Sequence, residues 1–172
     1  MSTGNEPAKT SGRSNERRLL RQFAGQWHVE CLYYTDPVMP PSESDGKLTV
    51  DLVGSNWCVS RFTTALMGMP FTEVAFVGLE PGTSNWLSFR VTSLSPHHYM
   101  LRGGYNDEQK ALLMAGSGPD PNTGRTAEFR TVEEFLDADR RKFEMFTQMP
   151  DGSGEYRLLT YHLTRLPEPA NP

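Results

Sequence analysis

Histidines are the side chains best suited to bind a metal ion or transfer a proton at neutral pH. Of the four in this chain, only His97 and His98 are adjacent. Neighbouring residues of a strand point to opposite faces, so these two rings are poorly placed to share one metal ion. The nearest acids, Asp107 and Glu108, follow a glycine turn and are not at ligand spacing. We therefore predict no metal site and interpret the pair as part of a polar loop.

His162 lies in the last strand-like segment, LLTYHLTR, where a histidine could bind haem. Alternation places Leu159, Tyr161 and Leu163 on one face and His162 on the other. If the leucine face is the core, His162 lies on the outside, and this is the interpretation we prefer. A polar lumen would invert the assignment. We accordingly predict no cofactor, with haem as the alternative.

Two further patterns bear on catalysis. In GSGPDPNTGRT, five residues separate Gly118 from Gly124, and Arg125 stands where a phosphate-binding loop has lysine, so we interpret this segment as a hairpin loop. Asp137 and Asp139 are two carboxylates that could exchange protons, but they flank a short turn and are expected to be solvated. Since the chain also lacks a nucleophile elbow, we assign no catalytic residue.

Three arginines in strand-like segments are candidates for burial: Arg61, Arg90 and Arg130. In NWLSFRV, Trp86, Ser88 and Arg90 share one face, so apolar and polar residues are mixed there. A solid apolar core would alternate more cleanly. The mixed pattern favours either a lumen that holds an amphipathic ligand or an outer wall that packs against a second subunit. An arginine in such a lumen would need a carboxylate partner.

The composition limits the classes of protein to which this chain can belong. It has 172 residues, a formal net charge of −4 and a pI of about 5.6. Nucleic-acid binding needs clustered Lys and Arg, so we predict none. The apolar runs are too short to span a membrane, and the first residues lack the apolar region of a signal peptide. Two cysteines make no disulfide framework. We therefore expect a cytoplasmic protein with no membrane partner.

The spacing of apolar residues predicts a single domain at 15–166, with unpacked tails at 1–14 and 167–172. The connections between its strand-like segments are too short for crossover helices, so the strands must pair antiparallel with their neighbours. Closure of such a meander gives an all-β, up-and-down barrel of about ten strands. The predicted strands are 26–35, 46–53, 56–66, 72–79, 85–93, 98–103, 110–117, 126–135, 139–148 and 155–165.

One short helix precedes the first strand and ends at Gly25, where FAGQW turns from helix to strand. Leu19, Leu20 and Phe23 fall at helical spacing and would plug one end of the barrel. Trp27 then points inward beside the plug. Val29, Cys31 and Tyr33 would share its face of the strand.

The helix followed by Gly-x-Trp resembles the start of lipocalins and other calycin-type barrels. GMPFTEVAFVGLE in the middle, and the segment from Asp120 to Arg165, resemble a bacterial family known only as a domain of unknown function. The resemblance covers about 18–166, with one departure, because Leu79-Glu80 stands where the family has Tyr-Asp. It implies a lipocalin-like barrel and no particular activity.

We therefore predict a lumen that binds a small hydrophobic or amphipathic molecule, with Arg61 and Arg130 as polar anchors. The first alternative is an isomerase- or cyclase-type enzyme that uses the same cavity, with Glu144, Glu128 or a histidine as its titratable group. The second is a non-catalytic module with a filled barrel that forms a homodimer. The predicted apolar walls of the lumen are Trp27, Tyr33, Trp57, Trp86, Phe143 and Tyr161.

Overall fold

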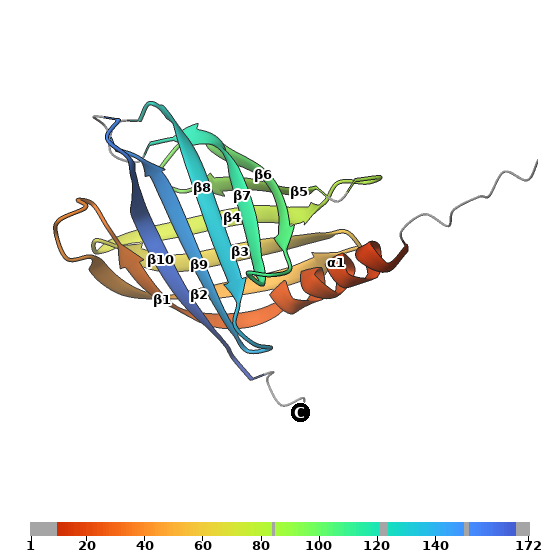
Figure 1. The fold of residues 1–172 in the computed structure, drawn as a ribbon. Helices are drawn as coiled ribbons and strands as arrows, with labels where there is room; N and C mark the ends of the chain where they lie inside the picture. The colour runs from red at the N-terminus through yellow and green to blue at the C-terminus, as the bar shows by residue number, and fades with distance from the viewer. Residues whose placement is uncertain (1–9, 84, 121–123, 150–151, 168–172) are drawn as a thin grey trace, which may run out of the picture.

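The computed structural model describes residues 10–83, 85–120, 124–149 and 152–167. One helix precedes ten strands (Figure 1). The helix begins within the predicted tail 1–14, and the rest of that tail and most of the tail 167–172 lie outside the described residues. The elements are α1 (Thr10–Phe23), β1 (Gly25–Tyr33), β2 (Ser42–Val53), β3 (Trp57–Leu66), β4 (Met69–Leu79), β5 (Trp86–Thr92), β6 (His98–Asn106), β7 (Ala111–Pro119), β8 (Thr126–Phe135), β9 (Arg140–Gln148) and β10 (Glu155–Arg165).

The ten strands form a closed antiparallel barrel in which each strand pairs with the next along the chain. The first and last strands close it, in a register that runs from Trp27 opposite Arg165 to Tyr33 opposite Leu159. Closure leaves no unpaired strand edge, which is why a meander of this length is stable without a covering layer. The predicted up-and-down barrel with a single helix is confirmed.

Strand alternation decides which side chains enter the barrel. Trp27, Val29 and Cys31 in β1 are almost fully buried, as their shared face predicts. In β10, Tyr161 and Leu163 are buried while His162 is exposed. The leucine face of β10 is therefore the inner one, and His162 points away from the lumen.

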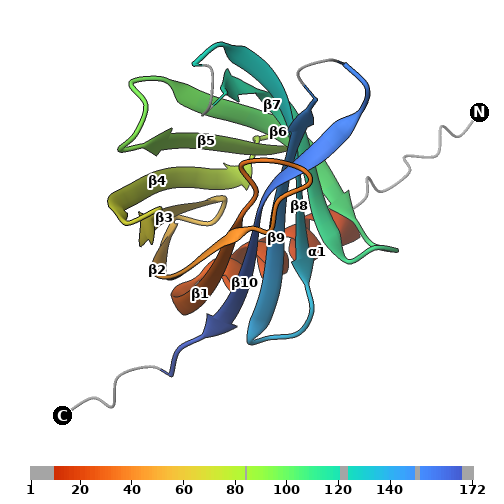
Figure 2. The same ribbon diagram turned by 90° about the vertical axis from the view of Figure 1, so that its left-hand side faces the viewer.

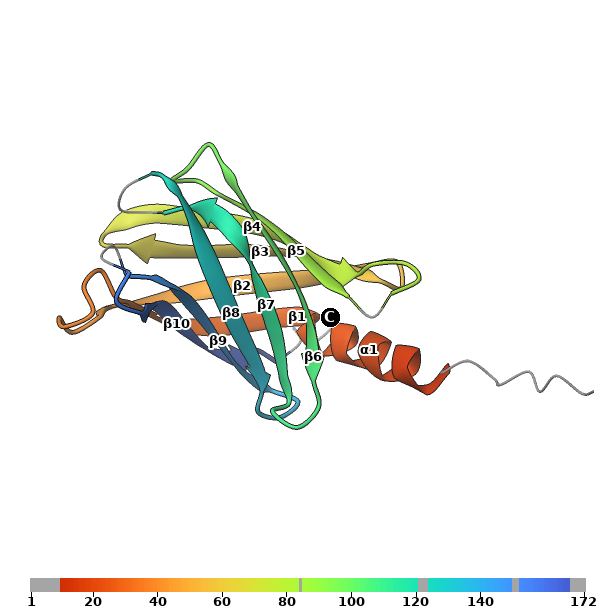
Figure 3. The same cartoon turned by 45° about the horizontal axis from the view of Figure 1, so that its top comes forward.

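Helix α1 closes one end of the barrel (Figures 1 and 3). Leu19, Leu20 and Phe23 are buried, as predicted, and the Phe23 ring lies 5.2 Å from Phe135 in an edge-on contact. The Trp27 Nε1 donates a hydrogen bond of 2.9 Å to the carbonyl of Phe23. Among the described residues, this helix is the only one, and it is neither long nor apolar enough to cross a membrane.

Arg165, in the barrel wall, forms hydrogen bonds with the end of α1. Its guanidinium donates hydrogen bonds to the carbonyls of Gln22 and Ala24, which a helix end leaves without partners. The positive charge also complements the carbonyl end of the helix dipole. Figure 2 looks toward the opposite end of the barrel, where the connections at 34–41, 67–68 and 93–97 lie.

Candidate functional site

Two cavities lie one behind the other inside the barrel. The first, called here the mouth cavity, has a volume of about 460 Å³ and opens between the loops at the end opposite α1. The second, the inner cavity, has about 50 Å³ and lies toward the helix, since Phe23 lines it. Glu73, Arg90 and Tyr161 line both cavities and so form the boundary between them.

The walls of the mouth cavity are mainly apolar, and its boundary with the inner cavity is polar. Strands on every side of the barrel contribute, because their inward positions alternate toward the lumen. Such a cavity suits a molecule with a large apolar part and one polar end. The apolar wall residues are Leu66, Met67, Met69, Phe71, Leu94, Phe129, Met145, Leu158 and Leu159.

The boundary is held by an ion pair between adjacent strands. Arg90 in β5 donates from Nη1 to Glu73 Oε1 in β4 at 3.1 Å, and from Nε to Ser88 Oγ at 3.0 Å. Its guanidinium also lies 4.7 Å from the centre of the Phe143 ring, across the lumen in β9. Because only 11% of the Arg90 side chain and 16% of the Glu73 side chain are exposed, water screens this pair weakly.

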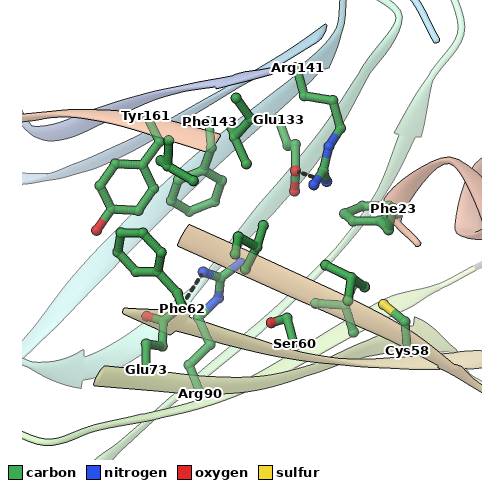
Figure 4. A pocket seen from close by; sticks show the side chains of 15 residues that line it. Phe23, Cys58, Ser60, Phe62, Glu73, Arg90, Glu133, Arg141, Phe143 and Tyr161 are labelled. Atoms are coloured by element: carbon green, nitrogen blue, oxygen red, sulfur yellow. Dashed lines mark hydrogen bonds and ion pairs between the residues drawn. The ribbon is translucent and has the colours of Figure 1, made fainter. Parts of the chain in front are cut away.

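A second ion pair lies deeper in the barrel and is almost completely buried (Figure 4). Arg141 in β9 donates from Nη1 to Glu133 Oε1 in β8 at 2.6 Å. The Arg141 guanidinium lies 4.2 Å from the Trp27 ring and 4.8 Å from the Phe23 ring. Burial raises the pKa of Glu133, and the charges of Arg141 and Arg90 oppose that rise only in part.

Tyrosines supply the remaining polar groups at the boundary. The hydroxyls of Tyr33 and Tyr161 lie 3.3 Å apart, and the Tyr161 ring packs 5.0 Å from that of Phe62. Burial raises the pKa of both phenols, so they stay neutral at physiological pH and act as hydrogen-bond donors and acceptors. Burial likewise raises the pKa of the Cys58 thiol to about 12, so this thiol in the inner cavity is not ionised.

Three of the eight predicted lumen residues line the cavities. Tyr33 lines the mouth cavity, Phe143 the inner cavity, and Tyr161 both. Trp27 and Trp86 are inside the barrel but pack at its closed end, where Trp86 lies 6.1 Å from Phe23. They belong to the plug that the helix completes.

The other three predicted residues lie on the outer wall, which corrects the prediction. Trp57 and Arg61 share the outer face of β3, because Cys58 and Phe62 take the inner positions. The Trp57 ring lies where a side chain on Gly78 would otherwise stand. Arg130 is also outside, and its partner is Glu155, which accepts hydrogen bonds from Arg130 Nε and Nη2.

Of the groups that the enzyme alternative would need, Glu144, Glu128 and His162 lie outside the lumen, whereas His97 lines the mouth cavity. Glu144 is on the outer face of β9, where Lys142 and Arg157 neutralise it. Glu128 and His162 are exposed. His97 is at the rim of the mouth cavity, whereas His98 stacks on Phe89, with ring centres 5.1 Å apart.

The sequence analysis missed Glu73, Glu133 and Arg141 as lumen residues. A signal for Arg141 exists in RRKFEMF, where it shares a face with Phe143 and Met145. An arginine at an inward position of an apolar face indicates a buried partner. Arg90 is one of the arginines predicted as candidates for burial, and its shared face with Trp86 and Ser88 does point inward.

Comparison with known proteins supports the fold and assigns no activity. Residues 13–165 match the model of a family described as "Protein of unknown function (DUF1579)". The chain is similar to the crystal structure of Rv2717c from M. tuberculosis, with a TM-score of 0.66 and 15% identity over 87% of this chain and 96% of that one. It is also similar to the S-type phycobiliprotein lyase CPES from Guillardia theta, with a TM-score of 0.59 and 9% identity over 91% and 98%. Comparison with curated protein sequences gives no match.

Proposed function

Since the chain belongs to the DUF1579 family of unknown function, we propose from its geometry that it binds one small amphiphilic molecule in the mouth cavity. The observation that carries this proposal is a cavity of about 460 Å³ with apolar walls and an Arg90–Glu73 pair at its boundary. Ligand pockets in proteins commonly have volumes of roughly 300–1,000 Å³ and a few polar groups that fix orientation.

Binding fits this cavity better than catalysis does. The charged groups at the boundary are paired with each other, and the Tyr33 and Tyr161 phenols are neutral. These groups can orient a ligand through hydrogen bonds, whereas a general base needs an available pKa near the working pH. The two structural relatives support the fold, and the word lyase in the description of one of them applies to that protein.

The test is a fluorescence titration with anilinonaphthalene sulfonate, an amphiphile that becomes bright in apolar surroundings. Thr92 lines the mouth cavity, so Thr92→Trp would fill space that the probe needs. The matched control is Val91→Trp, because Val91 is the neighbouring residue and is 39% exposed on the outer face. We expect saturable one-to-one binding that Thr92→Trp weakens by about tenfold or more, equivalent to about 1.4 kcal/mol.

Equal binding by the two variants would place the probe elsewhere and overturn the proposal. Circular dichroism and thermal unfolding of both variants show whether each retains the barrel, so loss of binding by misfolding is recognised separately.

A further inference from the structure

Arg141 has hydrogen-bonding capacity that the protein leaves unused. Only 2% of the residue is exposed, and its Nη1 is paired with Glu133. Its Nε and Nη2, called here the Arg141 fork, have no hydrogen-bond partner among the described residues. A buried donor without an acceptor destabilises the folded protein, and a charged donor does so more strongly. Such a cost indicates that a further acceptor belongs at this position.

The same chain shows what this pair of nitrogens binds. On the outer wall, Arg130 Nε lies 3.0 Å and 3.2 Å from the two carboxylate oxygens of Glu155, and Nη2 lies 2.6 Å from one of them. Nε and Nη2 form the side of the guanidinium that matches a carboxylate with two parallel hydrogen bonds. The Arg141 fork is the same chemical group in a buried setting.

The inner cavity has the size of such a head group. One water-sized group needs roughly 10–15 Å³ of cavity volume, so about 50 Å³ accommodates roughly three or four atoms of that size. A carboxylate has three heavy atoms. Arg141, Arg90 and Ser60 all line this cavity, and Figure 4 shows both guanidinium groups facing its interior from opposite sides.

We propose that the ligand is a carboxylate amphiphile whose head group lies in the inner cavity on the Arg141 fork and whose apolar tail fills the mouth cavity. This inference rests on the proposed function of the mouth cavity. The head group reaches its position past Arg90, whose guanidinium is hydrogen-bonded to Glu73 and Ser88 and packs on the Phe143 ring. A rotation of the Arg90 side chain opens this route.

The charge of the head group is balanced inside the barrel. The four charged groups that line the inner cavity are Glu73, Arg90, Glu133 and Arg141, whose formal charges cancel. A bound carboxylate adds one negative charge in a region of low dielectric constant, which raises the proton affinity of its acidic neighbours. Glu133, already desolvated, takes up one proton from solvent when the carboxylate binds, so the net charge of the site stays at zero and Arg141 is free to pair with the ligand.

The test compares decanoate with decanol, which has the same chain length and no carboxylate, by calorimetric titration of the whole protein. Charge-assisted hydrogen bonds contribute about 1.5–3 kcal/mol, so we expect decanoate to bind at least about tenfold more tightly. The Arg141→Lys variant keeps the charge and lacks the fork. The double variant Arg141→Met with Glu133→Leu removes both partners and leaves no unpaired buried charge. Both variants should lose the preference for decanoate and still bind decanol.

A measurement on the unmodified protein makes the test independent of how the variants fold. Decanoate labelled with carbon-13 at its carboxyl group reports its own ionisation by NMR. Held on a guanidinium, the bound carboxyl should stay ionised at pH values where free decanoate is protonated.

The outcomes separate the two proposals. If decanoate and decanol bind with equal affinity, or if the bound carboxyl titrates like the free one, the head-group assignment is overturned while the mouth cavity remains a binding site. If neither compound nor the fluorescent sulfonate binds, the proposed function fails, and this inference fails with it.

Discussion

At the scale of single residues, the interior of this barrel contains two arginines in ion pairs, Arg90 and Arg141. Arg141 has one carboxylate partner, Glu133, and lies within 5 Å of the Trp27 and Phe23 rings. Contact with aromatic rings replaces part of the electrostatic stabilisation that an arginine loses when it leaves water. Removing one member of a buried ion pair leaves the other charge uncompensated, whereas replacing both by apolar residues is often neutral or stabilising.

Unfolding in urea should reveal this asymmetry. We expect Arg141→Met to lower the free energy of unfolding by about 3–5 kcal/mol, because Glu133 then stays buried without its partner. The double variant with Glu133→Leu should recover most of that loss. A single variant that unfolds at the same urea concentration as the unmodified protein would contradict the buried ion pair.

The pH dependence of decanoate binding follows from Glu133. The charged and titratable groups around it are Arg141, Arg90 and Glu73, and the nearby Cys58 thiol, whose pKa is about 12, stays protonated. Burial already raises the pKa of Glu133, and a bound carboxylate raises it further. The complex therefore binds protons more strongly than the free protein does, so the affinity must fall as pH rises through the pKa of Glu133 in the complex.

Calorimetry at a series of pH values above the ordinary pKa of a glutamate checks this direction, and buffers of different ionisation enthalpy show the proton uptake directly. Glu133→Gln, which cannot titrate, serves as the control and should flatten the profile. An affinity that rises with pH in the unmodified protein would contradict the assignment of the proton to Glu133.

At the scale of elements, the close pairing of β6 with β7 depends on Gly103 in β6 and on Gly116 in β7, since a Cβ at either position would collide with the backbone of the other strand. A Cβ on Gly103 would lie 1.8 Å from the carbonyl oxygen of Leu113, which is backbone and cannot move aside without breaking the strand pairing. The next residue, Gly104, has no atom within 4 Å of the same position. Two adjacent glycines therefore have different roles.

Thermal unfolding of two matched variants tests this difference. Gly103→Ala should cost at least about 2 kcal/mol, since strand β6 must shift away from β7 to admit the methyl group. Gly104→Ala should be neutral or raise the stability by about 0.4–1 kcal/mol, because alanine restricts the unfolded chain. If both variants melted at the same temperature, the tight register at Gly103 would be refuted.

The sequence predicted these elements well and the site only in part. Alternation and turn residues located the helix and the ten strands, because both signals are local. In β3, however, both faces carry apolar residues, and the sequence analysis predicts the face of Trp57 as the inner one, whereas the structure buries that of Cys58 and Phe62. The outward position of Trp57 depends on Gly78 in the neighbouring strand β4, because the missing side chain of Gly78 leaves room for the Trp57 ring. The residue pattern of β3 alone does not carry this information. Contacts across the lumen, such as Arg90 with Phe143, depend on barrel closure and have no signature in sequence spacing.

At the scale of the whole molecule, the two ends of the barrel differ. Helix α1 and the aromatic residues beneath it close one end, while the other end opens into the mouth cavity. Exposed apolar side chains lie on the loops around that opening, among them Met67 at 59% and Leu94 at 49% exposure. Such residues are costly in contact with water and suit the passage of an apolar ligand. We propose on these grounds that the protein binds its ligand in the mouth cavity.

Methyl NMR of methionine-labelled protein tests that claim most directly, because methionines are distributed over distinct sites. Met69 and Met145 line the mouth cavity, whereas Met100 is 41% exposed on the outer face of β6. On titration with anilinonaphthalene sulfonate, ring currents should shift the methyl signals of Met69 and Met145 and leave that of Met100 unchanged. A shift of Met100 without a shift of Met145 would place the ligand on the outer wall and contradict the account.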